Sequence, residues 1–180
     1  VVAFNLPSVD LLNYEADDLI ATYAEQILAK GAKVTIVSSD KDLMQLYKKN
    51  VRLFDPMKNK FITPEDIVTK FGVGPEKVID VQSLAGDSSD NVPGVPGIGV
   101  KTAAELINKY GTLENLLDNA QEIKQNKRRE TLIENKAKAI ISKKLVTLMK
   151  DVPVERKIEE FQLKEIDKEK LYKFLREMEF

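Results

Sequence analysis

The pattern of apolar residues changes near residue 72, and this change constrains the fold more than any other feature. Before it, short β-rich runs alternate with amphipathic helical stretches, whereas from Pro75 onward the pattern is helical throughout. Alternating strands and helices are typical of a doubly wound, mainly parallel α/β sheet. We therefore predict an α/β part over residues 1–72 and a helical part over residues 73–180.

The expected elements follow from the same pattern. Val34–Ser38 (VTIVS) is a nearly unbroken apolar run, which is typical of a strand buried on both faces of a parallel sheet. Further strands are predicted at Ser8–Asn13 and Val51–Phe54, and helices at Ala16–Lys30, from Asp40 or Lys41 to Tyr47, and at Pro64–Phe71 behind a Thr63 cap. The helical part is expected to hold helices at Pro75–Ala85, Lys101–Tyr110, Leu113–Asp118, about Arg128–Met149 with a break in its middle, and Lys168–Glu179.

The composition excludes several kinds of catalytic site. The chain contains neither Cys nor His, which excludes thiolate nucleophiles, imidazole bases, Cys-type zinc sites and Ser-His-Asp triads. No apolar run approaches the roughly 20 residues that span a bilayer, so no membrane-spanning helix and no membrane partner are expected. Any catalysis must use carboxylates, Lys, Tyr, hydroxyl groups or a hard metal ion held by oxygen.

Three acidic clusters point to such a metal ion. They lie at positions 15–18 (EADD), 39–42 (SDKD) and 86–90 (GDSSD), and the first two follow predicted strands. Both can therefore face the crevice at the carboxyl ends of those strands. Converging carboxylates repel one another, and one or more Mg²⁺ or Mn²⁺ ions would relieve the repulsion. The candidate ligands are Glu15, Asp17, Asp18, Asp40, Asp42, Asp87 and Asp90. Each cluster alone is also explained by helix capping.

A glycine-rich hairpin, Asn91–Gly99 (NVPGVPGIG), follows the third cluster and leads into a predicted helix. Paired glycines before a helix expose backbone N–H groups where the helix dipole favours an anion. A phosphodiester could dock there without base contacts, and Gly97 or Gly99 is expected to need a positive φ. The alternative is a plain turn between two helices.

Charge is divided unevenly along the chain. Residues 1–120 carry a net charge of −5 and residues 121–180 a net charge of +4, although the whole chain is nearly neutral. Residues 121–150 hold nine Lys or Arg against three Glu. This stretch is either a solvated helix face or a phosphate-binding surface. In the second case Lys124, Lys127, Arg128, Arg129, Lys136 and Lys138 are expected near nucleic acid.

Three motifs occur in the order of a known family: YEADD at Tyr14–Asp18, SDKDL at Ser39–Leu43 and GDSSDNVPGVPGIG at Gly86–Gly99. Over nearly its whole length the chain resembles the 5′-nuclease domain of bacterial DNA polymerase I, a relative of flap endonucleases and phage 5′-nucleases. The ending LREMEF is similar to the exit of that domain toward a downstream polymerase domain. Such domains begin with a further strand that carries another metal-site Asp. The chain is therefore expected to be the C-terminal part of the domain.

The resemblance implies a PIN-like α/β fold, N-terminally truncated here, followed by a helical helix–hairpin–helix part. It implies a 5′-3′ exonuclease and flap endonuclease with two Mg²⁺ or Mn²⁺ ions, which hydrolyses phosphodiesters at 5′ flaps and nicks in branched or nicked duplex DNA. Such an enzyme acts in replication and repair in the bacterial cytoplasm. The implied metal ligands are the seven acids named above, with Asp40, Asp42, Asp87 and Asp90 as the catalytic ones. The implied DNA contacts are Gly94, Val95, Gly97, Ile98, Gly99, Lys101 and Thr102, with K⁺ on the carbonyls of Val95 and Ile98.

Two other functions stay open. The isolated chain could be a non-catalytic, sequence-independent duplex-binding module that uses only the hairpin and the basic helices. Asp40-Lys41-Asp42 also resembles the Asp-x-Asp motif of haloacid-dehalogenase-type phosphotransferases. That family expects Thr or Val where this chain has Met44, and it gives no account of the hairpin.

Overall fold

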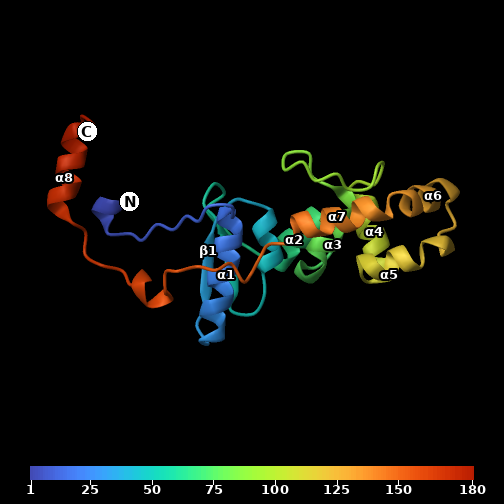
Figure 1. Cartoon of the computed structure of the whole chain (residues 1–180), viewed down its shortest axis with the longest axis horizontal. Coiled ribbons are helices and arrows are strands. Elements are labelled where there is room, and N and C mark those ends of the chain that lie inside the picture. The colour runs from blue at the N-terminus through green and yellow to red at the C-terminus, as the bar shows by residue number, and fades with distance from the viewer. The chain divides into compact units, whose positions relative to one another are not determined.

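The computed structural model describes residues 1–180, which divide into two compact units. Unit 1 consists of Val1–Ala32 and Met149–Phe180, and unit 2 of Lys33–Leu148. Unit 2 contains the sheet and most of the helices (Figure 1). No helix is both long enough and apolar enough to cross a membrane. The predicted division into an α/β part over residues 1–72 and a helical part over residues 73–180 stays a prediction.

The sheet of unit 2 has three strands in the order β1-β2-β3, with β1 at Val34–Val37, β2 at Val51–Asp55 and β3 at Lys60–Ile62. The first two pair in parallel, as predicted, and β3 returns antiparallel to β2. Three residues are too short to show a period of two, so β3 was not predicted. The expectation that β1 is buried on both faces is wrong. Ile36 is buried, but Thr35 and Val37, which share the other face of β1, are exposed, so only one face of the strand is covered.

The strand predicted at Ser8–Asn13 is also wrong. These residues belong to unit 1 and pair with no strand. The Ser8 carbonyl instead accepts a hydrogen bond from Nη1 of Arg156 (3.1 Å), and the chain turns at Asn13, which has a φ of 69°. An apolar run becomes a strand only when a neighbouring strand takes up its backbone N–H and C=O groups.

The predicted helices are present with ends shifted by a few residues, except that the one predicted from Asp40 or Lys41 to Tyr47 is a 3₁₀ helix over Asp42–Leu46 and the first turn of the one at Pro75–Ala85 is a 3₁₀ helix. Their bounds are α1 Ala16–Ala29, α2 Pro64–Phe71, α3 Val78–Ala85, α4 Val100–Tyr110, α5 Leu113–Asp118, α6 Asn126–Glu134, α7 Lys136–Val146 and α8 Lys168–Glu177. Short 3₁₀ helices add η1 Val2–Phe4, η2 Asp42–Leu46, η3 Pro75–Lys77, η4 Ala120–Glu122 and η5 Ile158–Phe161. The expected break in the long basic stretch falls at Asn135, and Thr63 caps α2 as predicted by accepting the N–H of Asp66 (3.2 Å).

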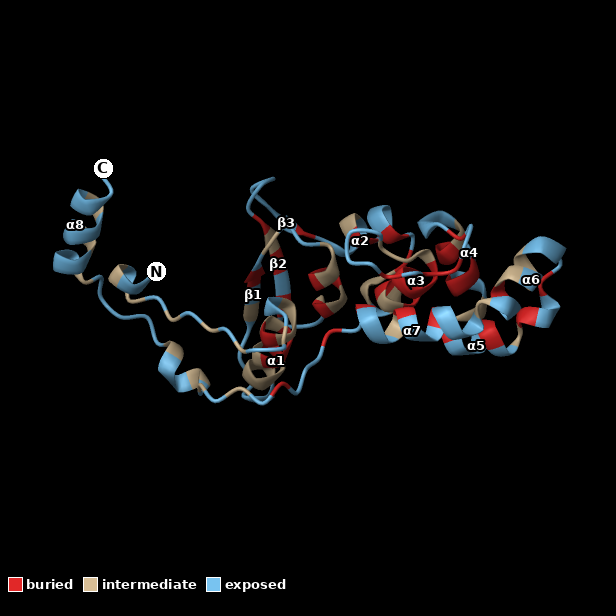
Figure 2. Ribbon diagram, turned by 45° about the horizontal axis from the view of Figure 1, so that its top comes forward, coloured by how far each residue is buried: buried red, intermediate tan, exposed pale blue.

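Helix α3 is the centre of the helical part of unit 2. Val78, Val81 and Leu84 are fully buried on it, and it packs against α4 and α7 (Figure 2). Lys143 of α7 adds polar ties, because its ammonium donates to Asp80 on α3 and to Glu114 on α5, both at 2.7 Å. The turn that follows α3 is therefore attached to the most firmly packed helix of the unit.

In unit 1 the C-terminal segment returns along α1. The hydroxyl of Thr22 accepts the N–H of Val152 (3.2 Å), and the Tyr23 hydroxyl donates to the carbonyl of Arg156 (3.0 Å). The Tyr23 ring also meets Phe161 edge-to-face, with centroids 4.8 Å apart. These contacts hold α1 to the segment that enters the unit at Met149.

Candidate functional site

Three carboxylates of unit 2 come together. Asp42 is the first residue of η2, and Asp87 and Asp90 lie on the turn after α3. One oxygen of each carboxylate lies within 4.8 Å of the others. The chain leaves β1 at Val37 and reaches Asp42 five residues later, so the cluster forms just beyond the carboxyl end of a parallel strand. Members of the second and third acidic clusters thus meet at the edge of the sheet where ligands gather.

Backbone hydrogen bonds fix the turn that carries Asp87. The N–H of Asp87 donates to the carbonyl of Val92 (2.9 Å), and the N–H of Val92 donates back to Asp87 (2.7 Å). Oδ1 of Asp87 accepts both the N–H (3.0 Å) and the hydroxyl (2.6 Å) of Ser89. Oδ1 is therefore engaged within the turn, and Oδ2 is the oxygen turned to other partners.

Lys41 brings a positive charge to the cluster. Its ammonium contacts Oδ2 of Asp87, whose side chain is only 8% exposed. The hydrogen bond from Lys41, helped by those from Ser89, lowers the pKa of Asp87 to about 2. The same hydrogen bond raises the pKa of Lys41, with smaller contributions from the charges of Asp42 and Asp90.

Asp42 has a different environment. Burial raises the pKa of its carboxyl group, although a hydrogen bond from Gln82 opposes the shift. Gln82 lies on α3 and is 4% exposed; its Nε2 donates to Oδ1 of Asp42, while its Oε1 is buried with no hydrogen-bond partner. A buried acceptor without a donor costs free energy, and a metal-bound water would supply the donor. An all-oxygen ligand set beside an unsatisfied buried oxygen fits Mg²⁺ or Mn²⁺.

The other four predicted acids are held in other ways. Oδ1 of Asp40 accepts the N–H of Asp42 (2.9 Å), but the N-cap of η2 is Lys41, so the helix-capping alternative for Asp40 is wrong. Asp18 in unit 1 accepts the N–H of Glu15 (3.4 Å) and a backbone N–H of the returning segment (2.8 Å). Glu15 is exposed at the N-cap of α1, and Asp17 is half-buried in its first turn. Their roles as metal ligands stay predictions.

Buried apolar side chains anchor the glycine hairpin. Val95 and Ile98 are 2% and 5% exposed, so the loop backbone stands on two side chains that are packed in the core. The N–H of Gly94 donates to the buried hydroxyl of Ser142 (2.9 Å), and the N–H of Val95 donates to the carbonyl of Leu84 (2.8 Å). The hairpin is thereby fixed to α3 and α7.

Two glycines close the base of the hairpin. Gly86 and Gly94 both have a positive φ, 71° and 59°. A Cβ on Gly94 would lie 2.5 Å from the backbone nitrogen of Gly86, and a Cβ on Gly86 would lie 2.7 Å from the carbonyl oxygen of Val92. Only glycine allows the two backbones to approach this closely.

The outer glycines face solvent. Gly97 has a φ of 75°, as expected for one of the pair, whereas Gly99 has a φ of −90° and needs no glycine for its conformation. A Cβ at either position would meet no protein atom within 4 Å. Gly99 is the N-cap of α4 and makes no side-chain cap, so first-turn N–H groups beside the exposed Lys101 can receive an anion.

A groove of about 410 Å³ lies between the hairpin and the start of α6. Pro96, Gly97, Ile98, Gln125, Lys127, Arg128 and Thr131 line it. Lys127 and Arg128 were expected near nucleic acid, but Gln125 and Thr131 were not predicted. The only available signal was spacing, since Thr131 lies four residues after Lys127 and three after Arg128 and so shares their helix face.

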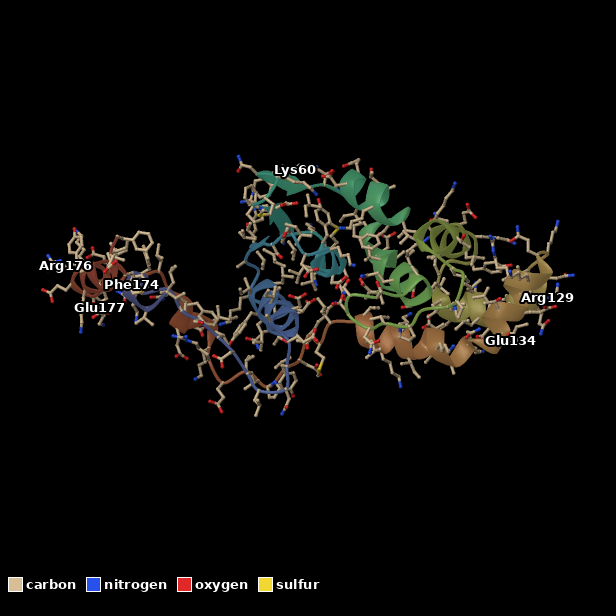
Figure 3. All side chains as sticks on the ribbon, turned by 90° about the horizontal axis from the view of Figure 1, so that it is seen from above. Lys60, Arg129, Glu134, Phe174, Arg176 and Glu177 are labelled. Atoms are coloured by element: carbon tan, nitrogen blue, oxygen red, sulfur yellow. The ribbon has the colours of Figure 1, made fainter.

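Of the other residues predicted near nucleic acid, Arg129 and Lys136 have protein partners, whereas Lys124 and Lys138 are exposed and do not line the groove. The guanidinium of Arg129 donates to the carbonyl of Ile123 (3.1 Å) and to Asn126 (3.0 Å), and Lys136 pairs with Asp118 (3.0 Å). Figure 3 shows Arg129 and Glu134 on α6. The groove therefore distinguishes Lys127 and Arg128 from the rest of the basic stretch.

Replacing Asp42 by Asn is expected to raise the melting temperature in metal-free buffer at pH 7 by roughly 2 °C. Folding raises the pKa of Asp42, so its ionised form costs stability, and Asn removes the charge while it keeps an acceptor for Gln82. The gain should be full above the raised pKa and shrink as the pH falls toward 3.8, the ordinary value. Calorimetry across this pH range measures it, with the exposed Asp118→Asn as control. A lower melting temperature at pH 7 would contradict the argument.

Comparison with known families covers most of the chain. Residues 1–72 match the 5′-3′ exonuclease N-terminal resolvase-like domain, and residues 73–169 match the 5′-3′ exonuclease C-terminal SAM fold. DNA polymerase I of Rhizobium leguminosarum is 54% identical over 178 residues, which are 99% of this chain and 18% of that protein. A 5′-3′ exonuclease of Aquifex aeolicus is 42% identical over 174 residues, 97% of this chain and 59% of that protein. The chain thus spans less than two thirds of either relative.

Solved structures share the fold. The T5 5′-exonuclease with bound zinc ions superposes with a TM-score of 0.72 and 26% identity, over 78% of this chain and 52% of that one. The catalytic core of Rad2 in complex with DNA gives a TM-score of 0.61 and 23% identity, over 97% and 60%. The predicted fold class, an α/β part followed by a helical part, is confirmed. With both of its parts matched in order, the chain belongs to the 5′-3′ exonuclease family.

Proposed function

We propose that this chain is the 5′-nuclease part of a DNA polymerase I-type protein, which hydrolyses phosphodiesters at 5′ flaps and nicks in DNA. One observation carries the proposal: the carboxylate cluster and the anion-binding hairpin lie on one unit and share a single turn, Asp87–Val92. A metal site that cleaves and a backbone site that holds phosphate are the two parts that such a nuclease needs. Membership of the 5′-3′ exonuclease family supports the same function.

Asp42, Asp87 and Asp90 would hold Mg²⁺ or Mn²⁺, and Asp40 is proposed as a further ligand of unit 2. Glu15, Asp17 and Asp18 of unit 1 are also proposed as metal ligands, and two ions are proposed in all. When bound, the metal supplies an activated water and stabilises the charge on the leaving oxygen. Within the chain, Ser89 orients the carboxylate of Asp87, and Gln82 orients that of Asp42. The zinc-bound structure of the T5 5′-exonuclease supports a divalent site.

The hairpin is proposed to hold duplex DNA through its backbone. Gly97 and Gly99 let a phosphate approach the first turn of α4, where Lys101 and Thr102 follow. Gly94, Val95 and Ile98 complete the loop, and K⁺ is proposed on the carbonyls of Val95 and Ile98. The Val95 carbonyl already accepts the N–H of Ile98 (3.0 Å), so K⁺ would use its second lone pair.

The test is cleavage of a labelled 5′ flap with and without Mg²⁺. It compares the 180-residue chain with the longer protein, meaning the full-length gene product that contains this sequence. A small phosphomonoester serves as the second substrate. We expect Mg²⁺-dependent flap cleavage by the longer protein and no phosphomonoester hydrolysis. Preferred hydrolysis of the phosphomonoester, or no flap cleavage by the longer protein, would overturn the proposal.

A second candidate function is duplex binding without cleavage by the chain alone. It is favoured by the position of the hairpin and the groove, which lie wholly within unit 2. Saturable binding of an uncleaved duplex, in the presence of Mg²⁺, would support this function for the isolated chain. Cleavage by the isolated chain would exclude it.

Neutralising Lys127 and Arg128 together, as Lys127→Gln and Arg128→Gln, is expected to weaken duplex binding and its salt dependence. Each lost phosphate contact should reduce the log–log salt slope by roughly 1. Fluorescence anisotropy in a NaCl series at fixed KCl measures the slope. Lys136→Gln is the matched control, because Lys136 pairs with Asp118 and does not line the groove. An unchanged slope in the double variant would show that Lys127 and Arg128 do not contact phosphate and that the basic stretch is a solvated helix face.

A further inference from the structure

We propose that Lys41 competes with a divalent cation for Asp87, so that metal binding at this carboxylate requires the ammonium to leave. The inference rests on the proposed metal-dependent function and adds a role for a residue between two acids of the SDKD motif. Lys41 is a positioning residue in this view. It holds the Asp87 carboxylate until a metal ion takes its place.

The hydrogen bonds of Asp87 leave one oxygen for both cations. Oδ1 is engaged by the N–H and the hydroxyl of Ser89, at 3.0 Å and 2.6 Å. The ammonium of Lys41 contacts the other oxygen, Oδ2. Mg²⁺ binds a carboxylate oxygen at about 2.1 Å, which is closer than a hydrogen-bonded ammonium. Two cations on one oxygen repel each other, so a metal ion on Oδ2 weakens the hold of the ammonium there.

In the absence of metal, the surrounding negative charges keep the Lys41 ammonium at the cluster. Oxygens of Asp42, Asp87 and Asp90 lie within 4.8 Å of one another, and the ammonium is attracted by all three carboxylates. Without a counter-ion these carboxylates repel one another. The lysine therefore stabilises the cluster in the geometry that a metal ion needs, and it lowers the affinity for that ion at the same time.

Displacement of the ammonium requires little rearrangement. The Lys41 side chain is 33% exposed, whereas that of Asp87 is 8% exposed. The four-carbon stem of a lysine can rotate into water while the backbone stays in place. The backbone is held at this point, because the N–H of Asp42 donates to Oδ1 of Asp40 (2.9 Å). The carboxylates can thus keep their positions while the cation between them is exchanged.

The test measures Mn²⁺ binding by titration calorimetry and melting in EDTA, on the 180-residue chain and three variants. Lys41→Met removes the charge and keeps most of the length, and it should bind Mn²⁺ on the order of tenfold more tightly than the parent. Lys41→Arg should bind more weakly, because a guanidinium can donate at once to Oδ2 of Asp87 and to the neighbouring carboxylate of Asp42 or Asp90. Lys136→Met removes an exposed ion pair elsewhere in unit 2 and should bind as the parent does. In EDTA, Lys41→Met should melt at a lower temperature than Lys136→Met.

Each outcome decides the proposal. Tighter Mn²⁺ binding by Lys41→Met, or binding by this variant alone, supports it. Unchanged or weaker binding by Lys41→Met, with binding by the parent, overturns the role of Lys41 but leaves the metal-dependent function standing. No binding by any of the four proteins overturns the role of Lys41, while the flap-cleavage test on the longer protein decides the metal-dependent function separately. If Lys41→Met does not fold, Lys41→Arg decides: weaker binding than the parent supports competition, and equal or tighter binding overturns it.

Discussion

Flap cleavage is expected to fall by roughly 100- to 1,000-fold when Asp87 is replaced by Asn in the longest protein in which this sequence occurs. The variant loses the negative charge on Oδ2, the oxygen that faces the cluster, while the remaining amide oxygen can still accept the hydrogen bonds of Ser89. Duplex affinity should change little, because the hairpin is fixed by its own contacts to α3 and α7. Single-turnover cleavage in Mg²⁺, beside anisotropy with an uncleaved flap, separates the two effects.

Asp90→Asn should act in the same direction and less strongly, because Asp90 is exposed whereas the Asp87 side chain is only 8% exposed. Asp118→Asn is the matched control, since it removes an exposed acid of unit 2 outside the cluster. Parent-like turnover in both Asp87→Asn and Asp90→Asn would show that these carboxylates do not form the metal centre.

Duplex binding is expected to weaken at least tenfold when Gly97 and Gly99 are both replaced by Ala, with a much smaller loss of thermal stability. A tenfold loss corresponds to about 1.4 kcal/mol, the size of one or two hydrogen bonds to a phosphate. Gly99→Val is the sharper variant, because Gly99 has a φ of −90° and a Cβ there meets no protein atom within 4 Å. Its effect on binding is therefore free of backbone strain. Anisotropy and melting curves on the same samples measure both quantities.

Gly31→Ala supplies the control for strain at Gly97. Gly31 and Gly97 have φ values of 77° and 75°, and a Cβ at either meets nothing within 4 Å. Both alanine variants should lose about 1 kcal/mol of stability, and only Gly97→Ala should lose duplex affinity.

Duplex binding by the parent should be stronger in K⁺ than in Na⁺, and the Gly97→Ala, Gly99→Ala double variant should lose this preference. If the double variant melts and binds as the parent does, the hairpin is only a turn.

The hairpin and the helices could be predicted because their determinants are local. Caps, glycines and prolines act within a few residues, as the Thr63 cap of α2 shows. The error at Ser8–Asn13 and the omission of β3 have the opposite cause, since strand pairing depends on residues far away in the chain. A hydrogen-bonding partner cannot be read from the apolar run itself.

The rule that ligands gather at the carboxyl ends of parallel strands placed Asp42 at such an end, but it gave no reason for Asp87 and Asp90, which follow helix α3, to meet it there. The residues that contact these site residues could not be predicted in the same way. Gln82 reaches Asp42 only because of the way α3 faces η2, and Thr131 reaches the groove only because α6 begins beside the hairpin. Such contacts depend on packing angles between helices, which leave no mark on residue spacing.

Because the base of the hairpin is closed, a duplex held by the hairpin would lie at a fixed distance from the carboxylates. Gly86 and Gly94 touch backbone to backbone, and Asp87 and Val92 exchange two hydrogen bonds, so no hinge separates the two sites. The distance between a phosphate held by the hairpin and the metal ligands would then be the same in every complex. Cutting at one constant offset along the strand, rather than over a spread of positions, would then be a property of this single short turn.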